Sequence, residues 1–229
     1  MEHPITFLTL LFDAIGLGDF AHHNMNVIYS WLVMLILLVF GKLAASRLEM
    51  VPKGAQNFFE VVIGGFEDFM VDVMGEHGRP YFPIIFTLFI YILLMNWLGL
   101  VPGMFSPTAN INTPLSMALP VLAVTFYIGF KEHGFKYVKH FMGPVPALAP
   151  LMFPIELIGH FARVLSLTFR LFGNILGEDL VLAILFFLAG AFLAPLPMMF
   201  LAIFTSFVQA FIFSLLTMLY FAAALEEAH

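Results

Sequence analysis

The sequence has no cysteine among its 229 residues, so disulfides, cysteine-bound zinc and iron–sulfur clusters are excluded. Charge is also scarce, because Asp, Glu, Lys and Arg make up 10% of the chain, against about 25% in a soluble domain. Hydrophobic residues make up 62%, and the mean hydropathy is +1.00. So few charges cannot keep a globule in water, and the composition therefore predicts an integral membrane protein. A net charge of −6 gives no reason to expect a nucleic-acid partner.

Several recognisable segments and sites are missing as well. The first 24 residues hold no Lys or Arg and are interrupted by Asp13 and Asp19, which is unlike a cleaved signal peptide. There is no internal repeat of the kind that builds inverted-repeat transporters. No Gly-rich phosphate loop and no metal-spaced histidine cluster occurs, and adjacent His22 and His23 fit a solvated segment better than a metal site. No cofactor is expected.

Long uncharged stretches define the predicted spans. They run from Asp19 to Lys42, from Arg79 to Lys131 and from Asp179 to Glu226, and a span needs roughly 20 apolar residues. The loop 102–114, rich in Pro, Asn and Gly, divides the second stretch. We therefore expect an all-α protein with five membrane-embedded helices. Their predicted ranges are 25–46, 82–101, 115–131, 155–190 and 197–226, with an outer segment at 1–24 and a cytoplasmic loop at 132–154.

The helix predicted at 155–190 is too long to stand upright. At 1.5 Å per residue its 36 residues would measure about 54 Å, nearly twice the hydrocarbon thickness. No proline lies between Pro154 and Pro195 to break it, so we expect strong tilt or curvature. The helix at 197–226, which begins with Pro197, is also longer than an upright span requires.

Basic residues predict the orientation. Seven of the nine follow the first and third spans, and none lies in the N-terminal segment or in the loops 102–114 and 190–197. The positive-inside rule then places the N-terminus outside and the C-terminus in the cytoplasm. The seven are Lys42, Arg47, Lys53, Arg79, Lys131, Lys136 and Lys139.

The segment 55–78 differs from the spans, because its apolar residues recur every three or four positions and acidic residues occupy the other side. This pattern predicts an amphipathic helix on the cytoplasmic interface. Its acidic face makes anionic lipid a poor partner, whereas a neighbouring subunit could hold it.

A polar stripe follows the helix predicted at 155–190. Residues spaced by four or seven share a helix face, and Glu156, Arg163, Ser166, Arg170 and Asn174 follow these spacings. The stripe continues to Glu178, with Asp179 at its edge. Gly173 and Gly177 form a GxxxG motif beside it, which allows another helix to approach closely.

Some of these residues have plain structural explanations. Arg163 could snorkel or pair with Glu156, and His160 could simply bond to Glu156. Arg170 is harder to explain, because it is far from both ends of its helix, and an arginine at mid-membrane costs at least about 2.5 kcal/mol. Gln209, expected at a similar depth, is the best partner within the chain, but a neutral amide cannot neutralise the charge. A counter-charge on another chain is therefore expected.

Two segments carry a family resemblance. "SLTFRLFGNILGEDLV" and "FVQAFIFSLLTMLYFAAALEE" resemble subunit a of F-type ATP synthases, as do "NWLGLVPG" and "SPTANINTPLSMAL" earlier in the chain. This resemblance implies a non-catalytic proton-channel stator in a bacterial inner membrane. The implied partners are a ring of c subunits, the b-subunit peripheral stalk, other synthase subunits and lipid.

The resemblance also implies residue roles. Arg170 matches the arginine that faces the rotor carboxylate, and Gln209 matches the glutamine near it. Asn174 and Asp179 match polar positions of the outer half-channel, whereas Glu156 and Ser166 match the cytoplasmic one. One departure is that the last helix lacks an ionisable partner in its first half, having Ala202, Thr205 and Ser206 there. The outer half-channel is therefore expected to depend on Glu178, Asp179 and water.

Other functions remain open at this stage. A secondary transporter could bind an anionic substrate at Arg170 and would work without partners. A voltage sensor needs arginines at every third position, and the chain has only two within this helix. The sequence leaves open whether the ion is H⁺ or Na⁺, and the proton is the default.

Overall fold

The computed structural model describes residues 6–14, 16, 18–45, 55–101, 103–134, 137, 149–189 and 195–226. These residues form α-helices and two short 3₁₀ helices, with no strand among them. Five helices are long and apolar enough to cross a membrane, which confirms the predicted all-α membrane fold. In chain order the elements are α1 Phe7–Ala14, α2 Gly18–His23, α3 Met25–Ala45, α4 Ala55–Met74, η1 Glu76–Tyr81, α5 Phe82–Gly99, η2 Pro107–Ala109, α6 Asn112–His133, α8 Ala149–Ala189 and α9 Pro195–Leu225.

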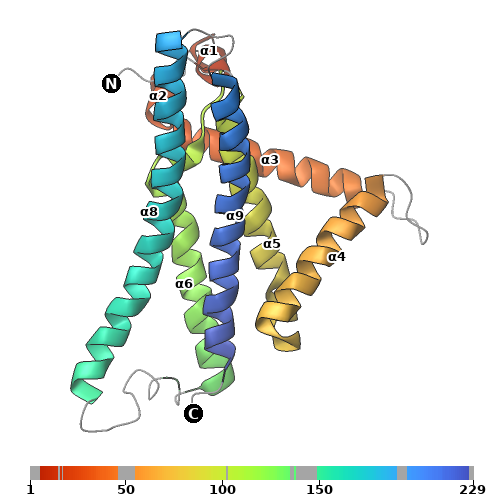
Figure 1. Ribbon diagram of the computed structural model, residues 1–229, viewed down its shortest axis with the longest axis vertical. Helices are drawn as coiled ribbons and strands as arrows, with labels where there is room; N and C mark the ends of the chain where they lie inside the picture. The colour runs from red at the N-terminus through yellow and green to blue at the C-terminus, as the bar shows by residue number, and fades with distance from the viewer. Residues whose placement is uncertain are drawn as a thin grey trace.

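The core lies where α5, α6, α8 and α9 pack together (Figure 1). Helix α9 contacts all three of the others and also α4. Phe213, Met218 and Phe221 of α9 are almost fully buried, and they join Ile92 of α5 and Leu171 of α8 in one apolar cluster. The apolar outer surface is left for lipid or partner chains, as expected of a membrane protein.

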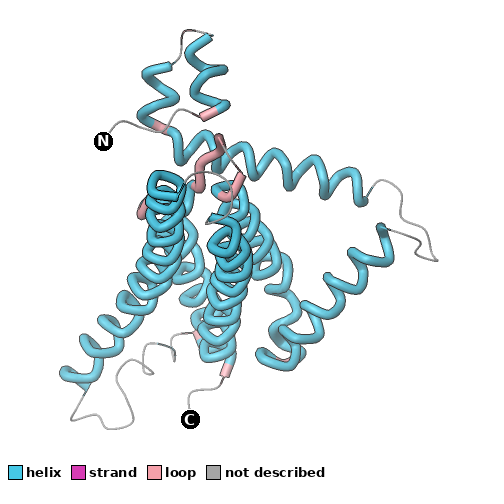
Figure 2. Tube along the Cα trace, turned by 45° about the horizontal axis from the view of Figure 1, so that its top comes forward, coloured by secondary structure: helices cyan, strands magenta, loops and turns pink. Residues whose placement is uncertain are grey.

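Helices α3 and α8 run in clearly different directions, and the two views agree on this (Figures 1 and 2). They therefore cannot both stand along the membrane normal. The 21 residues of α3 span about 31 Å, which fits an upright crossing, whereas the 41 residues of α8 span about 61 Å. A helix of that length can stay within the hydrocarbon only if it is strongly tilted, so the tilt of α8, and of α9 packed along it, stays a prediction.

The amphipathic helix α4 is held by its own chain at its C-terminal end. Met70 and Met74 are buried, and Phe66 packs against the rings of Phe82 and Phe89. Arg79 then forms an ion pair of 3.0 Å with a carboxylate oxygen of Glu67. A neighbouring subunit is therefore not required to hold this end. The N-terminal half, in contrast, exposes its apolar side chains Phe58, Phe59, Val61, Val62 and Ile63.

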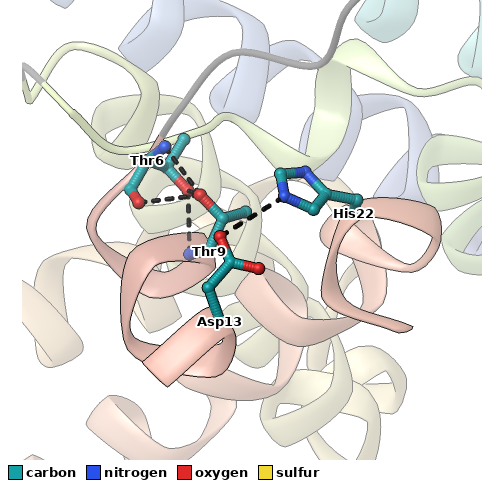
Figure 3. A network of polar contacts seen from close by, with 4 residues as sticks. All are labelled: Thr6, Thr9, Asp13 and His22. Carbon is teal, nitrogen blue, oxygen red and sulfur yellow. Dashed lines mark hydrogen bonds and ion pairs between the residues drawn. The ribbon is translucent and has the colours of Figure 1, made fainter. Parts of the chain in front are cut away.

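The first 24 residues contain two short helices, α1 and α2, which were not anticipated. The backbone N–H of Thr6 donates to the Thr9 hydroxyl, which in turn donates to the backbone oxygen of Thr6 (Figure 3). Both threonines are buried, whereas Phe7 of α1 is exposed. Nε2 of His22 lies 3.7 Å from a carboxylate oxygen of Asp13, which links α2 to α1. His22 thus has a carboxylate neighbour within the segment.

The connection between α5 and α6 is fixed by buried polar groups. Thr108 donates a 2.7 Å hydrogen bond to the side-chain oxygen of Asn96, and its hydroxyl also meets that of Ser106 at 2.9 Å. Asn96 in turn donates to the backbone oxygen of Ser206 on α9, at 3.4 Å. Gly99 permits this packing, since a Cβ there would lie 2.5 Å from Cβ of Ser106.

Several helix boundaries differ from those expected. Helix α8 begins at Ala149, within the predicted loop 132–154. Pro154 therefore lies in its second turn, where a proline removes few intrahelical hydrogen bonds. Helix α6 begins at Asn112 with Pro114 in its first turn, and ends at His133 before Gly134, which has φ +55°. Helix α9 begins at Pro195, and η1 follows α4 within the predicted 55–78 segment. The other expected features at 190–194, 46–54, 135–136 and 138–148 lie outside the described residues.

Candidate functional site

Arg170 lies near the middle of α8, as its twenty-second residue of 41. The helix rise puts it roughly 30 Å from either end. Its side chain is exposed, and one guanidinium nitrogen donates a 3.3 Å hydrogen bond to the Ser166 hydroxyl. No ion pair among the described residues includes Arg170, and its exposed side chain carries its charge at the surface of this chain.

The surface around Arg170 is made of small and polar residues. Ser166, Gly173, Asn174 and Gly177 are all exposed on this side of α8. A Cβ added at Gly173 or Gly177 would meet nothing within 4 Å. The GxxxG motif is therefore not used to pack the described helices of this chain. It leaves a shallow surface that another helix can approach closely.

Gln209 is buried beside this surface, but it pairs with Asn174 instead of Arg170. Nδ2 of Asn174 donates a 2.7 Å hydrogen bond to Oε1 of Gln209, joining α8 to α9. Gln209 is 3% exposed, so its carbonyl has a partner where water is scarce. The described residues show no hydrogen bond between Gln209 and Arg170; the amide oxygen of Gln209 accepts from Asn174, one turn further along α8, and Arg170 donates to Ser166.

Two acidic residues follow at the end of the stripe that is predicted to face outside. Glu178 is half-buried, and its carboxylate accepts a short hydrogen bond from the Thr205 hydroxyl of α9. Asp179 is adjacent and also half-buried. The Glu178 carboxyl thus lies at the contact between the two long helices, where an ionisable group is costly unless it has a function or a partner.

The other end of the stripe contains Glu156, His160 and Arg163. His160 is 4% exposed, and its Nδ1 lies 3.0 Å from the backbone oxygen and 3.9 Å from the carboxylate of Glu156. The guanidinium of Arg163 lies over the ring of Tyr220, 5.4 Å from its centroid, on α9. Glu156 therefore has His160 as a neighbour, and Arg163 has Tyr220. Arg170 has only the neutral hydroxyl of Ser166 as a hydrogen-bond partner among the described residues.

His160 and Arg163 also line a small cavity between α6, α8 and α9, together with Thr125 and Tyr220. Tyr137 is buried nearby. Burial raises the pKa of the Tyr137 phenol above its usual value, with the Arg163 charge acting in the opposite direction. The phenol is therefore neutral at neutral pH.

Two residues of α9 contact site residues in the structure, although their residue types did not predict this. The sequence predicted no role for Tyr220, yet its ring contacts the guanidinium of Arg163. Thr205 was noted only as a departure from the family pattern, yet it bonds to Glu178. The signal was present in the spacing, since Thr205 and Gln209 are four residues apart and face the stripe together.

Comparison with known sequences identifies the family. The family model described as "ATP synthase A chain" matches residues 27–222. The chain belongs to this family. A curated relative from Syntrophobacter fumaroxidans, "ATP synthase subunit a", is 61% identical, and the alignment covers all of both chains. Relatives of the same name from Desulfosudis oleivorans and Geotalea uraniireducens are 58% and 52% identical, again over the full length of each.

Membership of the ATP synthase A chain family covers the whole candidate site. The matched range includes all of α3 except its first two residues, every residue of the stripe from Glu156 to Asp179, and Gln209. It also includes the Thr108 cluster that ties the α5–α6 connection to α9. Helix α8 and all of α9 except its last three residues therefore lie within the matched range.

Proposed function

We propose that this chain is the proton-translocating stator subunit of a rotary ATP synthase and performs no catalysis itself. The observation that carries the proposal is the side chain of Arg170, exposed at mid-helix on a face of small residues. A fixed positive charge there needs a carboxylate from a neighbouring chain. Family membership supports a partner in the synthase, and we assign it to the ring of c subunits. The b-subunit stalk, other synthase subunits and the bilayer complete the surroundings.

The guanidinium acts by electrostatics. It keeps its proton at physiological pH, so it attracts a rotor carboxylate and favours its ionised form without relaying a proton itself. A proton arriving on the rotor is released there, and a direct leak past Arg170 is blocked. Moving one charge through the membrane potential supplies about 2.3 kcal/mol per 100 mV.

Two half-channels flank Arg170 in this proposal. On the outer side, Asn174, Gln209, Glu178 and Asp179 lead protons to or from the rotor. On the cytoplasmic side, Ser166 and Glu156 do so, with Arg163 and His160 nearby. The two openings are offset along the tilted helices α8 and α9, so a proton must travel on the rotor between them.

The orientation follows from the basic residues. With Lys42, Arg79 and Lys131 on the cytoplasmic side of a bacterial inner membrane, the N-terminus is periplasmic and the C-terminus cytoplasmic. The proton is the proposed ion.

The proposal is tested by ATP-driven proton pumping in inverted membrane vesicles containing the whole complex. Arg170→Ala is expected to abolish pumping while the subunit stays assembled. Arg79→Ala is the matched control, because its charge already pairs with Glu67 and Glu76 and lies away from the stripe. Normal pumping by Arg170→Ala would overturn the proposal.

A secondary transporter with an anion site at Arg170 is the alternative. An exposed arginine beside Gly173 and Gly177 fits a partner helix better than an enclosed substrate site. The alternative requires uptake of an anionic substrate by the purified chain alone in liposomes, whereas the stator proposal requires that the chain alone be inactive.

A further inference from the structure

The Thr205 hydroxyl lies at a point where three acceptors meet. It is within hydrogen-bond distance of a carboxylate oxygen of Glu178, of the backbone oxygen of Leu201 at 2.9 Å and of that of Ala202 at 3.3 Å. A hydroxyl has a single hydrogen to donate, together with lone pairs that accept. It therefore cannot donate fully to the carboxylate and to its own helix at once.

The protonation state of Glu178 decides which bond forms. An ionised carboxylate only accepts, so the Thr205 hydrogen must point at it. A protonated carboxyl can donate to the Thr205 oxygen, which frees the hydroxyl hydrogen for the backbone oxygen of Leu201. Rotation of one hydroxyl thus satisfies both states without any movement of a helix.

A second hydroxyl lies beside the same carboxyl. Ser206 is 1% exposed, and its hydroxyl oxygen has no hydrogen-bond partner among the described residues. It nevertheless lies close enough to Glu178 to interact with it, although short of full hydrogen-bond geometry. A buried hydroxyl without a partner is costly, and a proton-exchanging carboxyl next to it supplies one.

We propose that Glu178, Thr205 and Ser206 form a proton-holding site in the outer half of the α8–α9 pair, in which Thr205 is a positioning residue that reverses its hydrogen bond whenever Glu178 gains or loses a proton. This inference rests on the proposed stator function. The two hydroxyls take the place of the ionisable partner that α9 lacks. In this proposal the Thr205 hydroxyl keeps the half-buried carboxyl hydrogen-bonded in both protonation states.

The proton balance closes without any other reactant. Hydronium on the outer side gives its proton to the Glu178 carboxylate and leaves water. The Glu178 carboxyl then gives that proton to an ionised rotor carboxylate and returns to its starting state. Thr205 and Ser206 keep their own hydrogens throughout.

The charged groups that face Glu178 are few. Asp179 is adjacent, and Arg170 is eight residues away on α8, about 12 Å along the helix. Helices α5 and η2 carry no charged residue, α9 has none from Pro195 to Leu225, and the charges of α6 lie at its far end, from Lys131 onward. Among the described residues, the Thr205 hydroxyl is therefore the group of another helix that donates a hydrogen bond to the Glu178 carboxylate.

The test uses liposomes that contain the whole complex and make ATP from an imposed proton gradient. The pH on the outer face is varied while the total driving force is held constant. Thr205→Val should lower the rate about tenfold, the lower range of what a hydrogen bond to a charged group contributes. The pH of half-maximal rate should move upward, because the ionised carboxylate loses more than the protonated one when its donor is removed.

Two further variants separate positioning from packing. Thr205→Ser restores a hydroxyl and should recover both the rate and the pH profile. Thr217→Val is the matched control, since this buried α9 hydroxyl bonds only to its own helix, at 2.9 Å to the Phe213 oxygen. Rates are compared per assembled complex, so a loss of assembly does not hide the effect. The Thr205→Ala variant repeats the test with a smaller side chain.

The outcomes distinguish this inference from the proposed function. A wild-type rate and pH profile in Thr205→Val, or a Thr205→Ser variant as impaired as Thr205→Val, overturns the role of Thr205. If Arg170→Ala has meanwhile abolished pumping, the stator function stands and only the inference fails. If Arg170→Ala pumps normally, the stator function itself fails.

Discussion

Asn174 of α8 and Gln209 of α9 are joined by a 2.7 Å hydrogen bond between their amide groups, one helical turn beyond Arg170. Because Gln209 is buried, this bond fixes how the two long helices lie against each other at the level of the arginine. Arg170 is left free to face outward. The pair thus positions the charge without neutralising it.

The Asn174–Gln209 bond is expected to show energetic coupling. Asn174→Ala and Gln209→Ala should each lower the thermal stability of the detergent-solubilised complex, and the double variant should lower it by less than the sum. Hydrogen bonds between membrane helices contribute about 0.6 kcal/mol on average and at most about 1.7 kcal/mol. Strictly additive effects in a double-mutant cycle would contradict a direct bond.

Bulky residues at Gly173 and Gly177 should block partner assembly while the chain itself still folds. A Cβ at either position meets nothing within 4 Å among the described residues, and a leucine side chain there would extend over the surface beside Arg170. Gly173→Leu and Gly177→Leu should therefore leave the amount of membrane-inserted chain unchanged and reduce co-purification of the rotor ring. Gly41→Leu on α3, where a side chain also meets nothing, serves as the control. Retention of the ring by both stripe variants would argue against this surface as the rotor contact.

Thr108→Val should destabilise the protein by about 1–3 kcal/mol, because it leaves the buried side-chain oxygen of Asn96 without its donor. Thr125→Val is the comparison, as the Thr125 hydroxyl is also buried but bonds only to the Val121 oxygen of its own helix. The measurement is the temperature at which half of the solubilised protein aggregates. Equal shifts for the two variants would show that the Asn96 contact contributes nothing specific.

The contact between Arg163 and Tyr220 predicts a graded response. Tyr220→Phe keeps an aromatic face under the guanidinium and should change stability little, whereas Tyr220→Leu should cost about 0.5–2 kcal/mol. Thermal unfolding of the complex is again the measurement. If Arg163→Gln abolishes the difference between the two tyrosine variants, the cation–π contact is its cause; a difference that persists assigns it to packing.

The helices were predictable where the sequence has long apolar runs bounded by charge. Arg79, Lys131 and Glu226 mark polar ends that lipid cannot accommodate, so the five long helices followed from solvation alone. The start of α8 was predicted at residue 155, directly after Pro154, but the helix begins at Ala149. A proline near a helix N-terminus removes few intrahelical hydrogen bonds, so it does not mark the boundary. The helices α1 and α2 are too short, and too dependent on the Thr6–Thr9 and Asp13–His22 contacts, to leave a periodic signal.

The candidate site was predictable along one helix but not between two. Spacing by four and seven places Arg170 and its neighbours on one face of α8, since that follows from helix geometry. Which group of α9 meets each of them depends on how the helices slide and rotate against each other. The Asn174–Gln209 and Glu178–Thr205 pairs are products of that packing, and residue types alone favoured an Arg170–Gln209 contact that does not form.

The contacts of α9 with α4, α5, α6 and α8 have a consequence for biosynthesis. A ribosome makes α9 after all four helices that pack on it, so those helices enter the membrane before their shared partner exists. Until α9 arrives, Asn96 lacks the backbone oxygen of Ser206 and Asn174 lacks Gln209. The subunit can therefore complete these interhelical hydrogen bonds only after its last helix has been made and inserted.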